Sequence, residues 1–462
     1  MTTLSSTALA ADGLPERQRL RAMTAILVSL AMATLDTAIA NIALPSIAAD
    51  LQASAAASVW VVNAYQLAMV AALLPLASLG EIVGHRRVYI SGLLLFTASS
   101  LACGLAWSLP SLAAARVLQG LGAAAVMSVN TALIRFIYPS RMLGRAVGLN
   151  ALVVGLSFAV GPTVASIILS LGAWPWLFLI NVPIGLVAFA LARSALPATP
   201  RSGHGFDATA ASLSAGLFAF AVLGLGEATH GAPGWRVASE WAIALACGAA
   251  LLRRQAGHPA PMLAIDLFRR PVFALSAATS VCTFTAQGLA FVSLPFLFQT
   301  VMGHSQVETG FLMTPWPAVV ALMAPIGGRL SDRYPAGLLG GIGLATLSVG
   351  MMSLALLPAH PSLFDSGWRM ALCGFGFGFF QSPNLKAMMS SAPAARSGSA
   401  SGIVATARLL GQATGAALVA ACFSVSPAHG APLALWWGAA FAGVACLASF
   451  MRLAAGPQVQ AA

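Results

Sequence analysis

Three charged side chains lie within long apolar runs of this sequence: Asp36, Arg116 and Arg408. Asp36 is the only acid that we place deep in such a run. A charged carboxylate at the centre of a membrane span costs roughly 2.5–3.5 kcal/mol, which favours a functional reason for its presence. The pKa of a carboxyl group rises on burial and falls beside a cation, so it can be set for proton uptake. We predict that Asp36 carries a proton or balances a cationic substrate; the alternative is a carboxylate paired permanently for packing.

The two deep arginines have separate predicted roles. Arg116 faces Asp36 and sets its proton affinity, or it holds its own span against the rest of the first half. The alternative is a structural arginine whose charged head reaches the membrane surface. Arg408 balances charge in the second half or hydrogen-bonds to the backbone, and the sequence favours neither role.

Aromatic and amide side chains in the same runs are candidates to line a substrate path. Aromatic faces attract organic cations, and buried amides would give a cavity polar walls. The alternative for the aromatic residues is contact with lipid or packing. The candidates are Asn41, Trp60, Tyr65, Gln66, Asn130, Gln287, Trp316, Gln381 and Asn384.

The apolar runs themselves indicate a polytopic helical membrane protein. Of the 462 residues, 59% are hydrophobic and only 8% are charged, against about 25% charged in a soluble domain. The runs lack the period-two alternation of an outer-membrane barrel. We predict an all-α fold with fourteen transmembrane helices, at residues 22–44, 57–79, 88–107, 111–135, 146–171, 175–193, 208–226, 236–252, 273–299, 309–328, 338–357, 368–389, 400–425 and 431–452.

The basic residues follow this arrangement of spans. Of the 23 Lys and Arg residues, 19 fall on the side that also carries both termini, and only Arg236 and Arg369 fall on the other side. The positive-inside rule therefore places both termini in the cytoplasm. The net charge of +11 is explained by topology, so we expect no nucleic-acid partner.

Two glycine patterns recur in the same order in both parts of the chain. "QGLGAAAVMSVN" (119–130) and "CGFGFGFFQSPN" (373–384) share Gly-x-Gly followed by Asn, and Gly pairs thirteen residues apart recur at 148/161 and 402/415. Small residues let membrane helices approach closely, and internal repeats place substrate between the halves. We predict a first six-helix half at 1–193, a linker and inserted transmembrane hairpin at 194–272, and a second half at 273–462.

Several other classes of function lack support. The six Cys residues lie singly in apolar runs and no metal spacing occurs, so we predict no metal site. A phosphate-binding loop of the GxxxxGK[ST] type is absent, which argues against ATP hydrolysis. A membrane-embedded enzyme or a channel would need a catalytic cluster or a ring of pore charges, and the sequence shows neither.

Five stretches together resemble the major facilitator superfamily, and more narrowly its fourteen-span drug:proton antiporter family. They are "LDTAIANIALPSIAADL" (35–51), "WVVNAYQLA" (60–68), "RVLQGLGAA" (116–124), "GLSFAVGPTVAS" (155–166) and "LFLINVPIG" (177–185). The resemblance implies a monomeric exporter of hydrophobic, often cationic compounds in the cytoplasmic (inner) membrane, working by alternating access. Protons would be the coupling ion, with no other cofactor. An exporter of one metabolite, peptide or siderophore would share every one of these motifs.

The resemblance also implies roles for particular residues. Asp36 and Arg116 would couple protons, and the exporter element would comprise Gly155, Gly161 and Pro162. A cytoplasmic gate would comprise Glu81, Arg86, Arg87, Asp332 and Arg333; the alternative is ordinary loop charges.

The sequence departs from the family pattern at two places. In "ASLGEIVGHRR" (77–87), Glu81 stands for Asp and Ile82 for Arg, so one arginine contact of the gate is lost. Ala165 and Ser166 replace a Gly pair at the end of the exporter element. This second change leads us to expect looser helix packing there.

Overall fold

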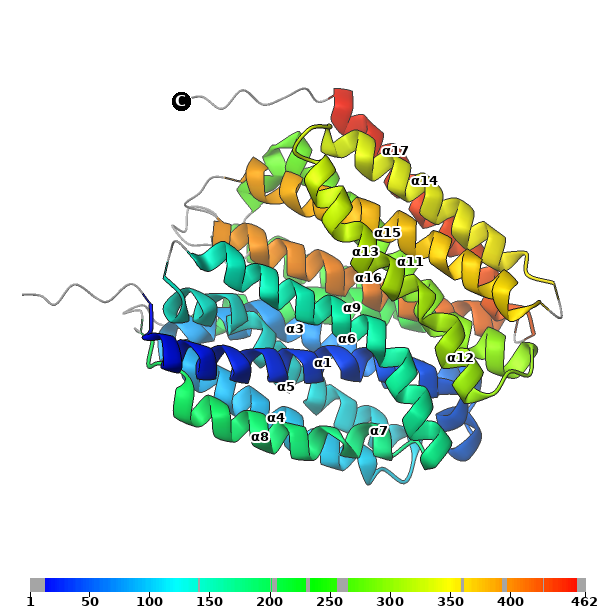
Figure 1. Ribbon diagram of the computed structural model, residues 1–462, viewed down its shortest axis with the longest axis horizontal. Coiled ribbons are helices and arrows are strands. Elements are labelled where there is room, and N and C mark those ends of the chain that lie inside the picture. Colours follow the sequence, from blue (N-terminus) through cyan, green and yellow to red (C-terminus); the bar gives the residue numbers. More distant parts are fainter. Residues whose placement is uncertain are drawn as a thin grey trace, which may run out of the picture.

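The structure is a computed structural model of the chain that describes residues 13–139, 142–199, 201, 206–229, 233–255, 265–358, 361–392, 397–426 and 428–454. Within the segment predicted as a linker and inserted hairpin (194–272), residues 202–205 and 256–264 lie outside these ranges. The described part is helical throughout (Figure 1). A helix satisfies its own backbone hydrogen bonds, as a segment surrounded by lipid must.

Each expected span falls on one helix or on two consecutive helices. The elements are α1 (Glu16–Asp50), α2 (Ala55–Ser58), α3 (Trp60–Val83), α4 (His85–Gly104), α5 (Leu109–Ile137), α6 (Leu143–Leu171), α7 (Trp176–Leu179), α8 (Asn181–Ala195), α9 (Ala208–Thr229), α10 (Gly234–Gln255), η2 (Ile265–Arg269), α11 (Pro271–Phe296), η3 (Leu297–Val301), α12 (Gln306–Met313), α13 (Pro315–Leu330), α14 (Ala336–Ala355), α15 (Leu363–Ser391), α16 (Ser397–Val425) and α17 (Gly430–Ala454).

The number of membrane-capable helices in the described residues is smaller than the fourteen expected. Eleven are long and apolar enough to cross a bilayer, or twelve if the bent pair within α6 is one span. In α9 only Ala208–Gly224 qualifies, as a shorter apolar helix. α15 is not among the eleven, because Asp365, Arg369 and Lys386 lower its hydropathy. Fourteen spans are therefore not confirmed.

The helices pack as two bundles with the same internal pattern (Figure 1). In the first bundle α5 packs on α3 and α4, and α1 packs on α6 and α8. In the second, α15 packs on α13 and α14, and α11 packs on α16 and α17. We call the end where α1 begins and α17 ends the termini side, and the other end the opposite side.

The two Gly-x-Gly repeats lie at equivalent helix crossings in the two bundles. A Cβ on Gly120 would stand 2.4 Å from the Tyr65 carbonyl oxygen of α3, and one on Gly374 would stand 2.3 Å from the Trp316 carbonyl oxygen of α13. Gly122 and Gly376 make the matching approaches to α4 and α14. Glycine is thus required where backbones touch, which accounts for the sequence repeat.

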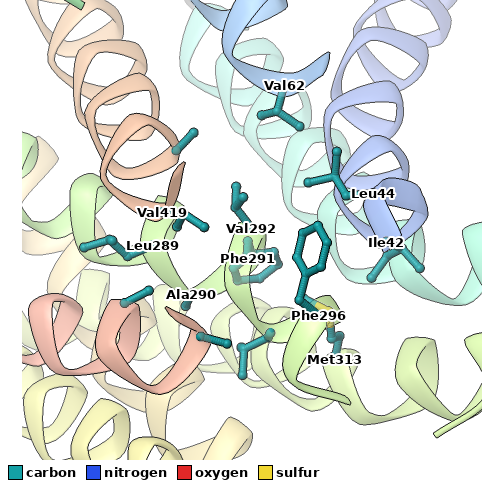
Figure 2. Packing of buried hydrophobic residues seen from close by; sticks show 14 of the residues in the cluster. Ile42, Leu44, Val62, Leu289, Ala290, Phe291, Val292, Phe296, Met313 and Val419 are labelled. Carbon is teal, nitrogen blue, oxygen red and sulfur yellow. The ribbon is translucent and has the colours of Figure 1, made fainter. Parts of the chain in front are cut away.

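The larger apolar cluster that joins the two bundles lies on the opposite side. One buried cluster there combines Ile42, Leu44 and Val62 with residues of the second bundle such as Phe291 and Val419 (Figure 2). On the termini side the buried residues fall into separate clusters. The first bundle's cluster reaches α16 only through Leu409 and its neighbours, whereas the other cluster belongs to the second bundle alone.

The helices of the expected inserted hairpin lie beside both bundles. α9 packs on α3 and on α16, and α10 packs mainly on α9. At the termini side, Asp207 pairs with Arg254 of α10 at 2.9 Å. Hydrogen bonding to Arg254 lowers the pKa of Asp207, so this contact is lost as the pH falls through that lowered value.

Candidate functional site

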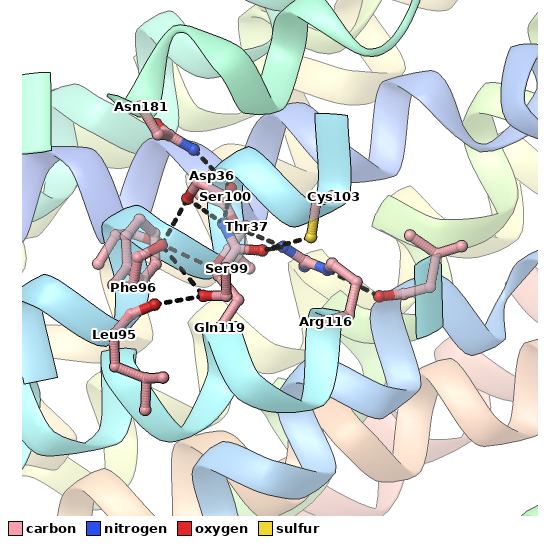
Figure 3. A network of polar contacts seen from close by, with 12 residues as sticks. Asp36, Thr37, Leu95, Phe96, Ser99, Ser100, Cys103, Arg116, Gln119 and Asn181 are labelled. Atoms are coloured by element: carbon pink, nitrogen blue, oxygen red, sulfur yellow. Dashed lines mark hydrogen bonds and ion pairs between the residues drawn. The ribbon is translucent and has the colours of Figure 1, made fainter. Parts of the chain in front are cut away.

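Asp36 is the centre of a buried polar network between α1, α4, α5 and α8 (Figure 3). Its side chain is almost completely enclosed, since the residue is 2% exposed. Arg116 Nη1 donates to Asp36 Oδ2 at 2.5 Å. Gln119 Nε2 and Asn181 Nδ2 donate to Asp36 Oδ1 at 2.9 Å and 2.8 Å. Three donors from two other helices therefore hold this carboxylate.

Arg116 is fixed on every side. Its Nε donates to the Val61 carbonyl of α3 at 2.9 Å, and its Nη1 also donates to Gln119 Oε1 at 2.6 Å. The guanidinium carbon lies 4.1 Å from the centre of the Tyr65 ring and 5.5 Å from that of Phe178. Cation–π contacts of this kind are worth about 2 kcal/mol when desolvated. The ion pair thus connects α1, α3, α5 and α8.

Sequence reasoning missed two members of this network. Gln119 follows Arg116 by one helical turn, which is the spacing at which helix side chains meet, and its Nε2 also donates to Ser100 Oγ at 2.8 Å. Asn181 lies in the span-six motif "LFLINVPIG". In each case the available signal was a polar side chain within an otherwise apolar motif that the sequence analysis had already quoted.

The predicted gate residues of the first half do not pair with one another in this conformation. Arg86 Nη2 donates to the Arg193 carbonyl at the end of α8, at 2.6 Å. Arg87 and Glu81 are exposed. Across the described ranges, no ion pair joins Glu81 to either arginine.

The predicted gate residues of the second half also make contacts within their own bundle. Lys386 Nζ of α15 lies 2.5 Å from Asp332 Oδ1, and Arg333 is exposed. Contacts described for these gate residues do not cross to the other bundle. A gating role stays a prediction, and it belongs to a conformation in which the termini side closes.

The exporter element on α6 has one close contact and one open position. A Cβ on Gly161 would lie 2.5 Å from the Ala38 Cβ of α1, whereas one on Gly155 would meet nothing within 4 Å. Pro162 lies inside α6, and its carbonyl accepts the Ser166 hydroxyl at 2.9 Å. Gly161 is therefore the position that lets α1 and α6 approach.

Ser166 joins the two bundles on the opposite side. Its single hydroxyl proton is shared between the Pro162 carbonyl of its own helix and the Gln306 carbonyl of α12, each 2.9 Å from Oγ. Thr163 and Thr314 share a hydrogen bond of 2.9 Å nearby. Gly310 leaves room for the serine, because a Cβ there would lie 1.7 Å from Ser166 Oγ. The expectation of looser packing is wrong for this conformation, since Ser166 adds a contact between bundles.

Four of the substrate-path candidates lie near the boundary between the bundles. Asn41 Oδ1 of α1 and Gln66 Oε1 of α3 are buried without a hydrogen bond. Gln287 Oε1 of α11 accepts from Gln412 Nε2 of α16 at 3.3 Å. Tyr65 is 1% exposed beneath Arg116.

The remaining candidates are more dispersed. Asn130 Nδ2 donates to Asn150 Oδ1, and Trp316 packs edge-to-face on Phe291 in the core. Asn384 is engaged within the second bundle, where its amide donates to Ser280 Oγ at 2.8 Å. The side chains of Trp60 and Gln381 are partly exposed.

The second bundle carries two deep or enclosed arginines of different kinds. Arg452 of α17 is 6% exposed and donates to Asn384 Oδ1 at 2.6 Å and Ser276 Oγ at 2.9 Å. Arg408 of α16 has a buried Nε without a hydrogen-bond acceptor. A role for Arg408 in balancing charge would need a carboxylate, and no ion pair of the described residues supplies one.

Two bundles of equivalent packing, with a buried ion pair in one of them, define a membrane transporter built from repeats. The chain belongs to the Major Facilitator Superfamily, whose sequence profile matches residues 26–416.

Its relatives are named as transporters or drug-resistance proteins, and their names do not agree on a substrate. The uncharacterized transporter YebQ of Escherichia coli K12 is 50% identical over 96% of this chain and 97% of its own length. The riboflavin transporter RibZ of Clostridioides difficile is 30% identical over 89% of each chain. The multidrug resistance protein Stp of Mycobacterium tuberculosis H37Rv is 32% identical, over 87% of this chain and 75% of its own.

Solved structures agree on the fold. A bacterial homologue of the human lysosomal transporter Spinster has a TM-score of 0.70 at 14% identity, covering 96% of this chain and 98% of its own. A D-xylose–proton symporter has a TM-score of 0.68 at 14% identity, over 93% and 97%. At this identity the likeness concerns the fold alone. Membership of the superfamily, together with the named relatives, makes the chain a transporter.

Proposed function

We propose that this protein is a proton-coupled antiporter that exports hydrophobic compounds across the cytoplasmic membrane, as a monomer, by alternating access. The observation that carries the proposal is the Asp36–Arg116 pair, which is buried where α1, α5 and α8 meet. A proton on Asp36 would neutralise the carboxylate and remove its attraction to Arg116. The contacts between α1, α5 and α8 would then change, which gives proton uptake a way to bias the arrangement of helices.

Alternating access needs two states, and the described conformation has the features of one. The bundles share an extended apolar cluster and hydrogen bonds on the opposite side, whereas on the termini side the first bundle's apolar cluster reaches α16 only around Leu409. We propose that the Arg-rich termini side faces the cytoplasm. This conformation would then be open inward, with the outer gate closed by Ser166 and its partners.

We also propose that the chain has fourteen spans, with α9 and α10 as an inserted hairpin between halves at 1–193 and 273–462. α15 packs on α13 and α14 in the second bundle, and its polar residues Ser366 and Asn384 are buried, whereas the charged side chain of Lys386 is exposed. A helix covered in this way needs less hydropathy to lie within a membrane. Packing of α9 on both bundles supports a hairpin inserted between the two halves.

The substrate class has two candidates. Drug export is supported by relatives such as Stp and the tetracenomycin C resistance and export protein of Streptomyces glaucescens. Transport of one metabolite is favoured by the relative RibZ, which is named as a riboflavin transporter. The family resemblance implies lipophilic cations, whereas the buried Nε of Arg408, which has no acceptor, favours an anionic substrate.

An efflux assay in an antibiotic-sensitive host tests the proposal. Cells that express the protein should lose preloaded dyes or amines faster than cells that express Asp36→Asn. A protonophore should remove this difference, because the proton gradient is the driving force. Efflux that persists with the protonophore, or that is equal in Asp36→Asn across pH 6–8, contradicts proton-coupled export.

A further inference from the structure

The charges in the membrane interior do not balance. Asp36 is already paired with Arg116 at 2.5 Å. Arg408 lies eleven residues into α16, or about 16 Å along the helix, which is roughly half of a bilayer core. The described ion pairs provide no carboxylate for it. Among the described residues of the interior, Arg408 is thus a positive charge without an ion-pair partner.

Arg408 differs in this respect from the other enclosed arginine of its bundle. Arg452 is surrounded by acceptors, namely Asn384 Oδ1, Ser276 Oγ and Ser449 Oγ, so its burial is compensated. By contrast, Arg408 Nε is buried and has no acceptor, while the residue as a whole is partly exposed. A cation in a membrane without such compensation is expensive, and it marks a functional position.

The surroundings of Arg408 lie on the boundary between the bundles. α16 packs against α3 of the first bundle, and Leu409 joins the apolar cluster that includes Tyr65 and Met69. Tyr65 is within electrostatic reach of Arg408, and its ring is also stacked under Arg116 at 4.1 Å. Tyr65 thus interacts with both arginines, through its ring with Arg116 and electrostatically with Arg408.

We propose that Arg408, with Tyr65 beside it, receives the negatively charged group of an amphiphilic organic anion, such as an aromatic carboxylate or phenolate. This inference rests on the proposed transport function and names its substrate class. An anionic group would supply the counter-ion and the acceptor that Arg408 lacks, and hydrogen bonds between charged groups are about twice as strong as neutral ones. A lipophilic cation would instead meet the excess positive charge.

Two dyes with the same xanthene ring system and opposite charge test the proposal. Binding of fluorescein, an anion, and rhodamine 6G, a cation, is measured by fluorescence anisotropy on the full-length protein in lipid nanodiscs, with empty discs as the blank. We expect fluorescein to bind the wild type more tightly than rhodamine 6G. Arg408→Gln should weaken fluorescein binding about tenfold, and Arg408→Lys should retain most of it. Arg253→Gln removes the same charge from an exposed position of α10 and should change nothing.

Melting temperatures separate binding from folding. Arg408→Gln and Arg408→Met should melt no lower than the wild type, because they remove an uncompensated cation. Arg452→Gln should melt lower, because its three acceptors lose their donor. Unfolding of both Arg408 variants would reveal a structural role and overturn the proposal.

Three binding results would also overturn it: tighter binding of rhodamine 6G, fluorescein binding unchanged in Arg408→Gln, or binding of neither dye. The antiporter function can survive such a result. Proton-driven transport of rhodamine 6G that is lost in Asp36→Asn but normal in Arg408→Gln would retain export and refute the anion site alone.

Discussion

Asp36 and Arg116 depend on each other, because both are enclosed and each is the other's counter-charge. Their depth and charge were readable from the sequence, since charges inside apolar runs are rare and costly. Gln119 and Asn181 were not predicted. Amides carry no such cost signal, and their importance follows from which helices meet, which a single sequence does not reveal.

Removing one charge of the pair should destabilise the protein more than removing both. Arg116→Gln leaves a buried carboxylate without its cation, which costs about 3–5 kcal/mol. The double variant Asp36→Asn/Arg116→Gln removes both charges and should recover most of the lost melting temperature without recovering transport. Thermal melting of the purified proteins measures this. A double variant that melts as low as the sum of the single effects indicates no coupling between the two residues.

Glycine positions decide how closely the helices of each bundle pack. The Gly-x-Gly repeat was visible in the sequence, and its two occurrences lie at equivalent helix crossings. The helical ranges were also predictable from apolar periodicity and length. Breaks within spans were not predictable, such as the one between α12 and α13 at Thr314. Proline lies inside the continuous helices α1 and α3, whereas Pro315 begins a new helix, so the presence of a proline does not by itself predict a break.

Alanine at a close crossing should therefore be destabilising, and alanine at an open position should not. A Cβ on Gly376 would lie 2.5 Å from the Leu347 nitrogen, so Gly376→Ala must separate α14 from α15. Overpacking of this kind costs about 1–3 kcal/mol. Gly155→Ala, where nothing lies within 4 Å, is the matched control and should melt like the wild type. Equal melting of the two variants would show that the α14–α15 crossing is looser than described.

The hairpin of α9 and α10 gives the topology its clearest test. Single cysteines at positions 230 and 260, in a variant without other cysteines, should lie on opposite sides of the membrane in the fourteen-span arrangement. A membrane-impermeant thiol reagent added to intact cells should label position 230 and spare position 260. Labelling of both, or of 260 alone, would exclude that arrangement.

At the scale of the whole molecule, the two bundles are joined unequally at their two ends. Sequence repeats predicted two halves, but they could not predict which end is closed. That outcome depends on contacts between residues far apart in the chain, such as Ser166 with Gln306 and Gln299 with the Ile42 carbonyl. The predicted gate at Glu81 concerns the other end, where the described contacts of the gate residues stay within one bundle in this conformation.

Ser166→Ala should shift the balance of states away from the one that is closed on the opposite side. It removes one hydrogen bond between bundles, worth about 0.5–1.5 kcal/mol, and therefore changes the ratio of states by a few-fold to about tenfold. Paired spin labels at the ends of α6 and α12 on the opposite side should report longer distances more often. Ser170→Ala, whose hydroxyl bonds only within α6 at the Ile167 carbonyl, is the control. An unchanged distance distribution in Ser166→Ala removes Ser166 from the gate.

Proton coupling through Asp36 is the central claim, and transport into sealed proteoliposomes tests it most directly. An imposed pH gradient should drive uphill accumulation of a dye by the wild type, and dissipation of the gradient should stop it. Asp36→Asn, which keeps the shape of the side chain but takes up no proton near neutral pH, should still bind the dye yet show no uphill transport. Accumulation by Asp36→Asn at the wild-type rate and extent would contradict the account.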